Sequence, residues 1–284
     1  MLNVKIDLDS VAKSIREVAD SCIVPRFQNL HTGEIHFKGE DDPVTIADQE
    51  AEKELSKRFM DLLPGSKVVG EESFAENPSV FDHFLGDSPV WIIDPVDGTK
   101  CFIAGEPLYG VIVSLTKQNH TLAAWLYDPT SKEFITAEEG SGAYWKGQKL
   151  SVLPPAPLGE MTGILGLQIM EGFEAQGCVL SPDSKPPIER MYSACHDYSR
   201  LVAPKPHFSG RFDQVHFHGW SRTCTPWDCA AGVLIHKEAG GYSAHWNGDA
   251  FVPSSYKRGI LAAPDKESWE SVKAWIESAC ECGD

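Results

Sequence analysis

The sequence predicts a protein of mixed α and β structure, and two kinds of apolar pattern support this fold class. Apolar residues recur at helical spacing over residues 9–27 and again over 51–62. Short apolar runs, such as residues 90–94, are typical of buried strands. Because helices and strands both recur along the chain, an all-α or all-β fold is excluded.

In the first half, helices precede strands. The first helix begins after an Asp/Ser cap, and Pro64-Gly65 ends the second. Strands are then expected near residues 68–69, 90–94, 109–116, 121–127, 133–138 and 143–145. Pro154, Pro155 and Pro157 indicate a boundary after these strands. We therefore expect an α+β half over 1–152 and an α/β half over 153–284, within one compact unit.

The second half is expected to alternate strands and helices. Its expected strands lie near residues 162–167, 212–218 and 259–263, and its expected helices near 184–203, 226–239 and 269–276. Polar residues interrupt the first of these helices. The closing helix carries Trp269, Val272 and Ile276 on one face. We expect His245 to lie on the surface.

Composition limits the classes of function. The 284 residues carry a formal net charge of −16, which argues against direct nucleic-acid binding because phosphate backbones need a basic face. No apolar stretch is long enough to cross a membrane, and the first residues lack a signal-peptide core. The eight cysteines form no C-x-x-C pair, so we expect most to be reduced thiols in a cytoplasmic protein.

The most informative segment is Asp94-Pro95-Val96-Asp97-Gly98-Thr99. The apolar run before it predicts a buried strand that places Asp94 at its carboxyl end, and a tight turn at Gly98 presents Asp97 on the same side. Two neighbouring carboxylates repel each other, so a cation between them would stabilise the turn. The pattern indicates divalent-metal chemistry on a phosphate, whereas a common acidic turn is the alternative.

Two other acidic segments flank this one. Glu71 or Glu72 follows a short strand and could supply another carboxylate, although a solvated Glu pair would look the same. Asp228 lies in the first turn of a helix that has Pro226 at its start and Gly240 after its end. A carboxylate there also favours the helix dipole, which is the structural alternative.

Taken together, the segments G-E-E-S, W-I-I-D-P-V-D-G-T and P-W-D-x-A-A-G-V-L-I resemble the inositol monophosphatase superfamily. The resemblance runs from about Lys38 to Gly241. It implies a layered α/β/α/β/α sandwich of the sugar-phosphatase type, and a magnesium-dependent, lithium-sensitive hydrolase with two or three Mg²⁺ ions. Its implied metal ligands are Glu71, Asp94, the carbonyl of Val96, Asp97 and Asp228.

The resemblance also implies roles around the attacking water. Thr99 would help to activate it and Asp48 would hydrogen-bond Thr99, while Lys38 matches a mobile loop near the site. Asp41 or Asp42 would lie near a weaker third metal. Magnesium ions cancel the charge of a phosphate ester and lower the pKa of a bound water, so that water attacks directly. The amides of Gly98 and Thr99 would hold a phosphate oxygen.

The substrate must be selected opposite the metals. We expect Ser193, Ala194, Asp197 and Arg222 to contact it. The chain departs from the family here: Tyr192 stands before Ser193-Ala194 where Gly is usual, and Trp220-Ser221-Arg222 appears where a Glu is expected. We favour a small polyol phosphate such as inositol monophosphate. Histidinol phosphate or a nucleotide 3′-phosphate is the alternative.

A role of a different class is also open. Some bacterial members of the superfamily are partners of the transcription machinery, and such a role would use a surface rather than the metal site. The resemblance further implies a homodimer. The expected partner is a small phosphorylated metabolite, with no membrane and no direct nucleic-acid contact.

Overall fold

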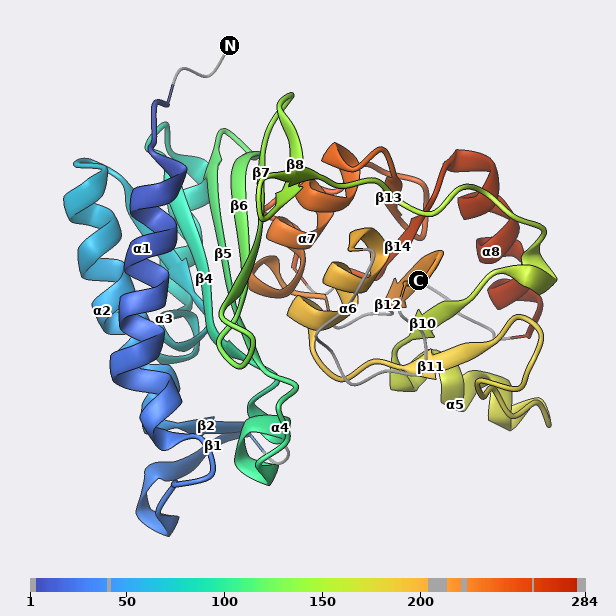
Figure 1. The fold of residues 1–284 in the computed structure, drawn as a ribbon, viewed down its shortest axis with the longest axis horizontal. Coiled ribbons are helices and arrows are strands. Elements are labelled where there is room, and N and C mark those ends of the chain that lie inside the picture. The colour runs from blue at the N-terminus through green and yellow to red at the C-terminus, as the bar shows by residue number, and fades with distance from the viewer. Residues whose placement is uncertain (1–3, 40–41, 204–213, 221–223, 257, 280–284) are drawn as a thin grey trace.

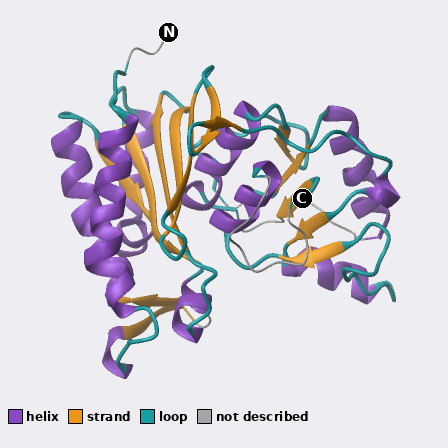
Figure 2. Cartoon of the chain, viewed as in Figure 1, coloured by secondary structure: helices purple, strands orange, loops and turns teal. Residues whose placement is uncertain are grey.

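Two β-sheets and three layers of helices alternate in the structure, a computed structural model that describes residues 4–39, 42–203, 214–220, 224–256 and 258–279 (Figure 1). The order across the molecule is helices, large sheet, helices, small sheet, helices (Figure 2). The predicted layered α/β/α/β/α sandwich is therefore confirmed.

The first outer layer consists of α1 (Leu8–Val18) and α2 (Ile46–Leu62). A π-helical turn, Ala19–Ile23, and a 3₁₀ turn, Val24–Arg26, extend α1, so the helix expected over 9–27 is confirmed with a changed hydrogen-bond pattern at its end. Val11, Ile15 and Val18 are fully buried. Their spacing places one face of α1 against the large sheet, where it shields the core.

The large sheet has the strand order β3-β4-β5-β6-β7-β8-β9. Its strands are β3 (Lys67–Gly70), β4 (Val90–Asp97), β5 (Gly110–Lys117), β6 (His120–Asp128), β7 (Glu133–Glu138), β8 (Gly142–Trp145) and β9 (Gln148–Lys149). β3 and β4 are parallel, and every other neighbouring pair is antiparallel. All eight residues of β4 are buried, because helices cover both faces of the sheet there.

The middle layer consists of α6 (Ala194–Val202) and α7 (Pro226–Glu238). α7 contacts β4 to β7 of the large sheet on one side and β13 on the other. The small sheet has the order β11-β10-β12-β14-β13. Its strands are β10 (Gly163–Leu165), β11 (Ile188–Arg190), β12 (Phe217–Trp220), β13 (Tyr242–His245) and β14 (Ile260–Ala263). The last layer is α5 (Leu167–Ala175) and α8 (Lys266–Ala279).

Shorter elements complete the chain. A two-stranded antiparallel hairpin joins β1 (Ile35–Gly39) to β2 (Asp42–Thr45), beside α4 at one end of the large sheet (Figure 1). The short helices are α3 (Glu71–Glu76) and α4 (Thr99–Ala104), with 3₁₀ turns at Thr32–Glu34, Pro78–Leu85 and Leu158–Glu160. Within the described residues, none of the helices combines the length and the apolar character that crossing a bilayer requires.

Some expectations for the second half are wrong. The helix expected over 184–203 exists only as α6, and its first part is a loop and β11. Pro186 and Pro187 explain this difference, since proline lacks an amide donor and disfavours helix before it. The strand expected over 212–218 begins only at Phe217 among the described residues; 212 and 213 lie outside them.

His245 is also misplaced by the prediction. It is 2% exposed, not on the surface. Its ring nitrogens lie 2.9 Å from the Gly259 carbonyl oxygen and 3.0 Å from the Ser255 hydroxyl. A buried imidazole is stable when both nitrogens have partners, and the sequence shows neither partner.

Candidate active site

The carboxyl end of β4 positions the first two acidic residues. The pairing between β4 and β5 is irregular between Asp94 and Asp97, which turns the strand out of its regular ladder. The Val96 amide donates to Asp94 Oδ1 at 3.1 Å and holds that carboxylate in place. Gly98 has φ +83°, and a Cβ there would lie 2.5 Å from the Leu108 carbonyl oxygen. Only glycine therefore fits between β4 and α4.

Asp228 joins these two residues from the other half of the chain. Asp94, Asp97 and Asp228 each offer a carboxylate oxygen, and these oxygens lie within 4.8 Å of one another. Asp228 is in the first turn of α7 and accepts hydrogen bonds from the Thr225 hydroxyl and, at 3.3 Å, from the Thr225 amide. The cap that starts the helix thus also fixes the carboxylate.

Asp97 is further held by the start of α6. Its carboxylate accepts hydrogen bonds from the Ser193 hydroxyl, from the Ala194 amide at 3.1 Å and from the Cys195 amide at 2.7 Å. The Ser193 oxygen also lies 2.9 Å from Nδ1 of His196. Asp97 is therefore bound on one side by the protein, which orients its remaining lone pairs.

Without a cation, burial and mutual repulsion destabilise the charged forms of the three carboxylates. Burial raises the pKa of Asp94 and of Asp228 well above the usual range, and the charge of Glu71 raises both further. Burial also raises the pKa of Asp97 to about 6, although its hydrogen bonds oppose the shift. Oxygen ligands of this charge and spacing suit a hard divalent cation such as magnesium. The donor set therefore fits the metal that the family resemblance implies.

Without metal, the contribution of Asp97 to the free energy of unfolding is expected to fall as the pH rises. Folding moves the pKa of Asp97 from 3.8 to about 6, so the folded state keeps a proton that the unfolded state loses. The resulting stabilisation is complete below pH 3.8 and is lost as the pH rises through about 6. Urea denaturation of the wild type and of Asp97→Asn in EDTA, at about pH 5 and about pH 7, measures this, because the opposite contribution of the buried histidines is common to both proteins. A stability difference between the two proteins that is the same at both pH values would contradict it.

Glu71 and Lys38 form a neighbouring ion pair. Lys38 Nζ lies 2.5 Å from Glu71 Oε1 and 3.0 Å from Glu72 Oε1. Burial alone would lower the pKa of Lys38, but the two glutamates outweigh it and raise that pKa. Glu71 begins α3 directly after β3, as the strand-end prediction requires. Its carboxylate is held by Lys38, and it is not one of the three that lie within 4.8 Å of one another.

Thr99 and Asp48 lie together at the base of the site. The Thr99 hydroxyl is 3.2 Å from Asp48 Oδ1 and 3.0 Å from the Val96 carbonyl oxygen. The other oxygen of Asp48 accepts from the Thr45 amide at 2.8 Å and from the Thr45 hydroxyl at 2.5 Å. Burial raises the pKa of Asp48 to about 6, against these hydrogen bonds. The pair expected from the sequence is therefore in direct contact.

A cavity of about 330 Å³ opens beside the carboxylates. Its lining includes Asp42, Pro43, Asp97, Gly98, Thr99, Lys100, Met191, Tyr192, Ser193, Ala194, Trp220 and Asp228. Of the expected substrate contacts, Ser193 and Ala194 line this cavity. Asp197 is 3% exposed and does not line it, and Arg222 lies outside the described residues, as does Asp41. Met191 lines the cavity too, although no motif in the sequence marks it.

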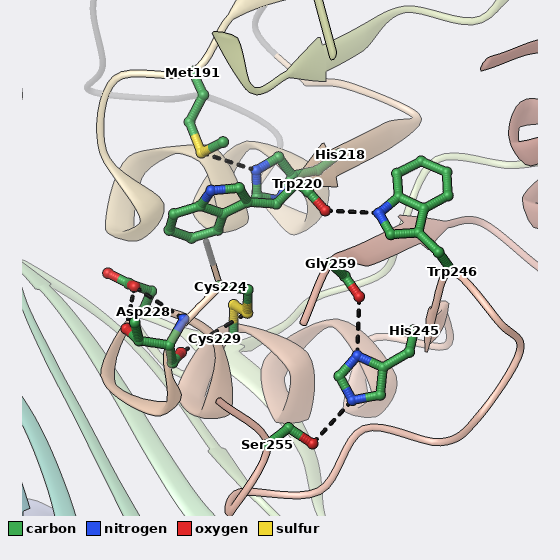
Figure 3. The surroundings of a disulfide bond; sticks show 11 residues. Met191, His218, Trp220, Cys224, Asp228, Cys229, His245, Trp246, Ser255 and Gly259 are labelled. Atoms are coloured by element: carbon green, nitrogen blue, oxygen red, sulfur yellow. Dashed lines mark hydrogen bonds between the residues drawn. A yellow bond between two sulfur atoms is a disulfide. The ribbon is translucent and has the colours of Figure 1, made fainter. Parts of the chain in front are cut away.

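A disulfide lies beside Asp228 (Figure 3). Cys224 and Cys229 are bonded, with their Cα atoms 6.4 Å apart, and they bracket the Thr225–Asp228 cap (Figure 3). Cys22, Cys101, Cys178 and Cys195 are free thiols. The expectation that most cysteines are reduced therefore holds for these four, but it missed the pair next to the site.

The sandwich and the buried carboxylate cluster together define a protein that can hold divalent cations beside a small-molecule cavity. The sequence profile of the Inositol monophosphatase family matches residues 4–282. The chain belongs to this family, and the family hypothesis drawn from the sequence is confirmed.

Several named proteins are similar to this chain. Inositol-1-monophosphatase of Rhizobium meliloti is 32% identical over 231 residues, covering 78% of this chain and 77% of the relative. Histidinol-phosphatase of Chlorobaculum parvum is 32% identical over 224 residues, covering 76% and 77%. Nus factor SuhB of Haemophilus influenzae is 29% identical, covering 87% and 88%. The solved structure of a Thermotoga maritima IMPase has a TM-score of 0.76 at 26% identity, covering 97% and 99%.

Proposed function

We propose that this protein is a magnesium-dependent phosphomonoesterase that acts on a small phosphorylated metabolite. The observation that carries the proposal is the group of three carboxylates from β4 and α7 beside a cavity large enough for a small ester. Asp94, Asp97, Asp228, the Val96 carbonyl and Glu71 would hold two or three Mg²⁺ ions. Bound magnesium would neutralise the ester charge and lower the pKa of the attacking water.

The residues of the chain supply the proton path. A hydroxyl has one proton, so Thr99 donates it to either Asp48 or the Val96 carbonyl and keeps lone pairs that can accept a proton from water. As Thr99 takes the proton of the attacking water, it passes its own to Asp48. The pKa of Asp48, raised to about 6 by burial, makes this carboxylate a stronger base than an exposed one. The Gly98 and Thr99 amides would hold the phosphate.

A panel of phosphate monoesters tests the proposal. It contains inositol 1-phosphate, histidinol phosphate, a nucleotide 3′-phosphate and glycerol 2-phosphate, each assayed for phosphate release with Mg²⁺ and with EDTA. We expect release from at least one ester with Mg²⁺ and none with EDTA. Equal release under both conditions would contradict a metal-dependent mechanism. The relatives named inositol-1-monophosphatase and histidinol-phosphatase have the same sequence identity to this chain, 32%. The comparison therefore does not identify the alcohol of the substrate.

Lithium is expected to inhibit the activity at millimolar concentration. Li⁺ is a small hard cation that prefers oxygen ligands, and it can take a carboxylate site while carrying too little charge to replace Mg²⁺. A titration of LiCl at fixed Mg²⁺, with KCl as the ionic-strength control, measures the effect. Identical rates in the two salts would contradict the prediction.

A partner role in transcription is a second candidate, supported by the relative named Nus factor SuhB. Asp94→Asn protein is the useful bait, because it separates surface docking from catalysis. Capture of transcription proteins by this variant would favour the partner role. Hydrolysis by the wild type, with no capture by the variant, would favour the enzyme. By family resemblance we also propose a cytoplasmic homodimer, which size-exclusion chromatography with light scattering and cell fractionation test.

A further inference from the structure

The two walls of the cavity differ in chemistry. Asp97, Thr99 and Asp228 form the charged wall. Met191, Tyr192 and Trp220 also line the cavity and form its second wall, which consists of a thioether and two aromatic side chains. Figure 3 shows the Met191 and Trp220 side chains together on one side of Asp228. A phosphate held at the carboxylates would therefore direct its alcohol toward an aromatic surface.

Trp220 is held firmly in this wall. It ends β12, and its carbonyl oxygen accepts a hydrogen bond from Trp246 Nε1 at 2.8 Å. Its ring packs against the buried group of Cys224, Cys229 and Ile260. A ring fixed by packing loses little conformational freedom when a ligand stacks on it, so it is a preorganised platform.

Met191 and Trp220 both lie close to Gly166. A Cβ at this position would lie 3.1 Å from Met191 Cε and 3.5 Å from Trp220 Cδ1. The missing side chain lets the thioether and the indole lie together over the end of β10. Met191 is held in turn by His218, whose Nε2 is 3.5 Å from the sulfur. Met191 and Trp220 thus form a continuous apolar surface, and His218 packs against Met191.

Tyr192 adds a second aromatic ring to the cavity lining. Tyr192 is 55% exposed, so its ring is accessible to a ligand. The guanidinium carbon of Arg190 lies 5.9 Å from the centre of the ring. This cation–π contact orients the ring without covering it.

Two polar groups next to Tyr192 in the cavity lining, the Ser193 hydroxyl and the Ala194 amide, already have partners. The Ser193 hydroxyl and the Ala194 amide both donate to Asp97, and Ser193 is 2% exposed. Both donor protons are thus committed to Asp97, and the Ser193 oxygen also lies 2.9 Å from Nδ1 of His196, so these two groups offer a polyol no free donor. A buried hydroxyl that loses water without gaining a partner weakens binding. A planar ring needs no such partner and stacks favourably on aromatic side chains.

We propose that Trp220 and Tyr192 are specificity-determining residues that favour phosphate monoesters whose alcohol carries an aromatic or heteroaromatic ring over polyol phosphates. The proposal rests on the phosphomonoesterase function above and names the substrate class of the same site. An imidazole, a phenyl ring or a nucleobase has the required chemistry.

The test compares kcat/KM for ring-bearing and ringless esters. Histidinol phosphate and 2-phenylethyl phosphate carry a ring, whereas inositol 1-phosphate and glycerol 2-phosphate do not. In the wild type we expect both ring-bearing esters to be preferred by about tenfold or more. Trp220→Ala should lower that ratio by about tenfold, mainly through KM, and Trp220→Phe should restore most of it. Tyr144→Ala, on β8 and outside the cavity lining, is the control and should leave the ratio unchanged.

The outcomes separate the two levels of the proposal. Should Trp220→Ala fail to fold, the exposed Tyr192→Ala decides, with a smaller fall of the ratio expected. Preference of the wild type for the polyol esters would overturn the inference, and so would equal loss on all four esters in both alanine variants. In either case Mg²⁺-dependent hydrolysis would still stand. Failure to hydrolyse any ester would instead overturn the proposed function itself, and the inference with it.

Discussion

Asp94→Asn is expected to lower kcat/KM for every hydrolysed ester by at least about one hundredfold, equivalent to roughly 2.7 kcal/mol of transition-state stabilisation. Asp94 is one of the three converging carboxylates, and an amide oxygen is a much weaker ligand for magnesium than a carboxylate. The fold should be kept, because Asn has nearly the same volume and its oxygen can still accept the hydrogen bond from the Val96 amide.

Asp61→Asn is the matched control, since Asp61 is an exposed carboxylate near the end of α2. Its kinetic constants should equal those of the wild type. Circular dichroism of both variants shows whether the fold is kept. If Asp94→Asn retained more than about a tenth of the wild-type rate, the assignment of Asp94 as a metal ligand would be wrong.

The second large effect is a reversal in stability. Magnesium is expected to stabilise the wild type by about 2.7 kcal/mol at one hundred times its Kd, which raises Tm by about 5–10 °C. In EDTA, Asp94→Asn should be more stable than the wild type, because the neutral amide avoids the cost of either protonating Asp94 or burying its charge among like charges. In saturating Mg²⁺ the order should invert, because the variant gains little from the ion.

Thermal denaturation of the wild type, Asp94→Asn and Asp61→Asn, each in EDTA and in Mg²⁺, measures the reversal. The control should follow the wild type in both conditions. Two results would show that the carboxylates do not repel one another as described. One is a wild-type Tm that does not change with Mg²⁺. The other is an Asp94→Asn protein that is less stable than the wild type even in EDTA.

The sequence predicts the regular parts of the fold because local patterns define them. The apolar stripe of α1 and the strand Glu133–Glu138 appear where expected, since periodicity alone distinguishes a helix face from a strand. The order of the five layers came from family resemblance. Periodicity reports which face of an element is buried, but not against which element it packs.

Errors occur where long-range contacts decide. His245 is buried because Gly259 and Ser255, which lie in the following loop, supply partners for its ring. The hairpin β1–β2 and the helix α5 were not predicted, since a strand of four or five residues and a helix of nine residues carry little periodic signal. The Cys224–Cys229 disulfide was missed because spacing alone does not identify a pair.

For the site, Asp94, Asp97 and Asp228 lie together as the motifs indicated, whereas Glu71 lies outside that group and its role as a ligand stays a prediction. The motifs do not indicate how the protein holds these side chains. The role of the α6 amides as donors to Asp97 follows from the packing of two halves of the chain. The ion pair of Glu71 with Lys38 is likewise visible only in three dimensions. The aromatic wall required the position of Trp220 relative to Asp228, which no local pattern contains.

Anomalous diffraction from crystals soaked in Mn²⁺ tests the central claim most directly. Manganese prefers the same oxygen ligands as magnesium and scatters anomalously, so each bound ion is located without ambiguity. We predict at least one strong anomalous peak in contact with carboxylate oxygens of Asp94, Asp97 and Asp228. Absence of any peak there at saturating Mn²⁺, with these side chains as close together as described, would contradict the claim that they form a divalent-cation site.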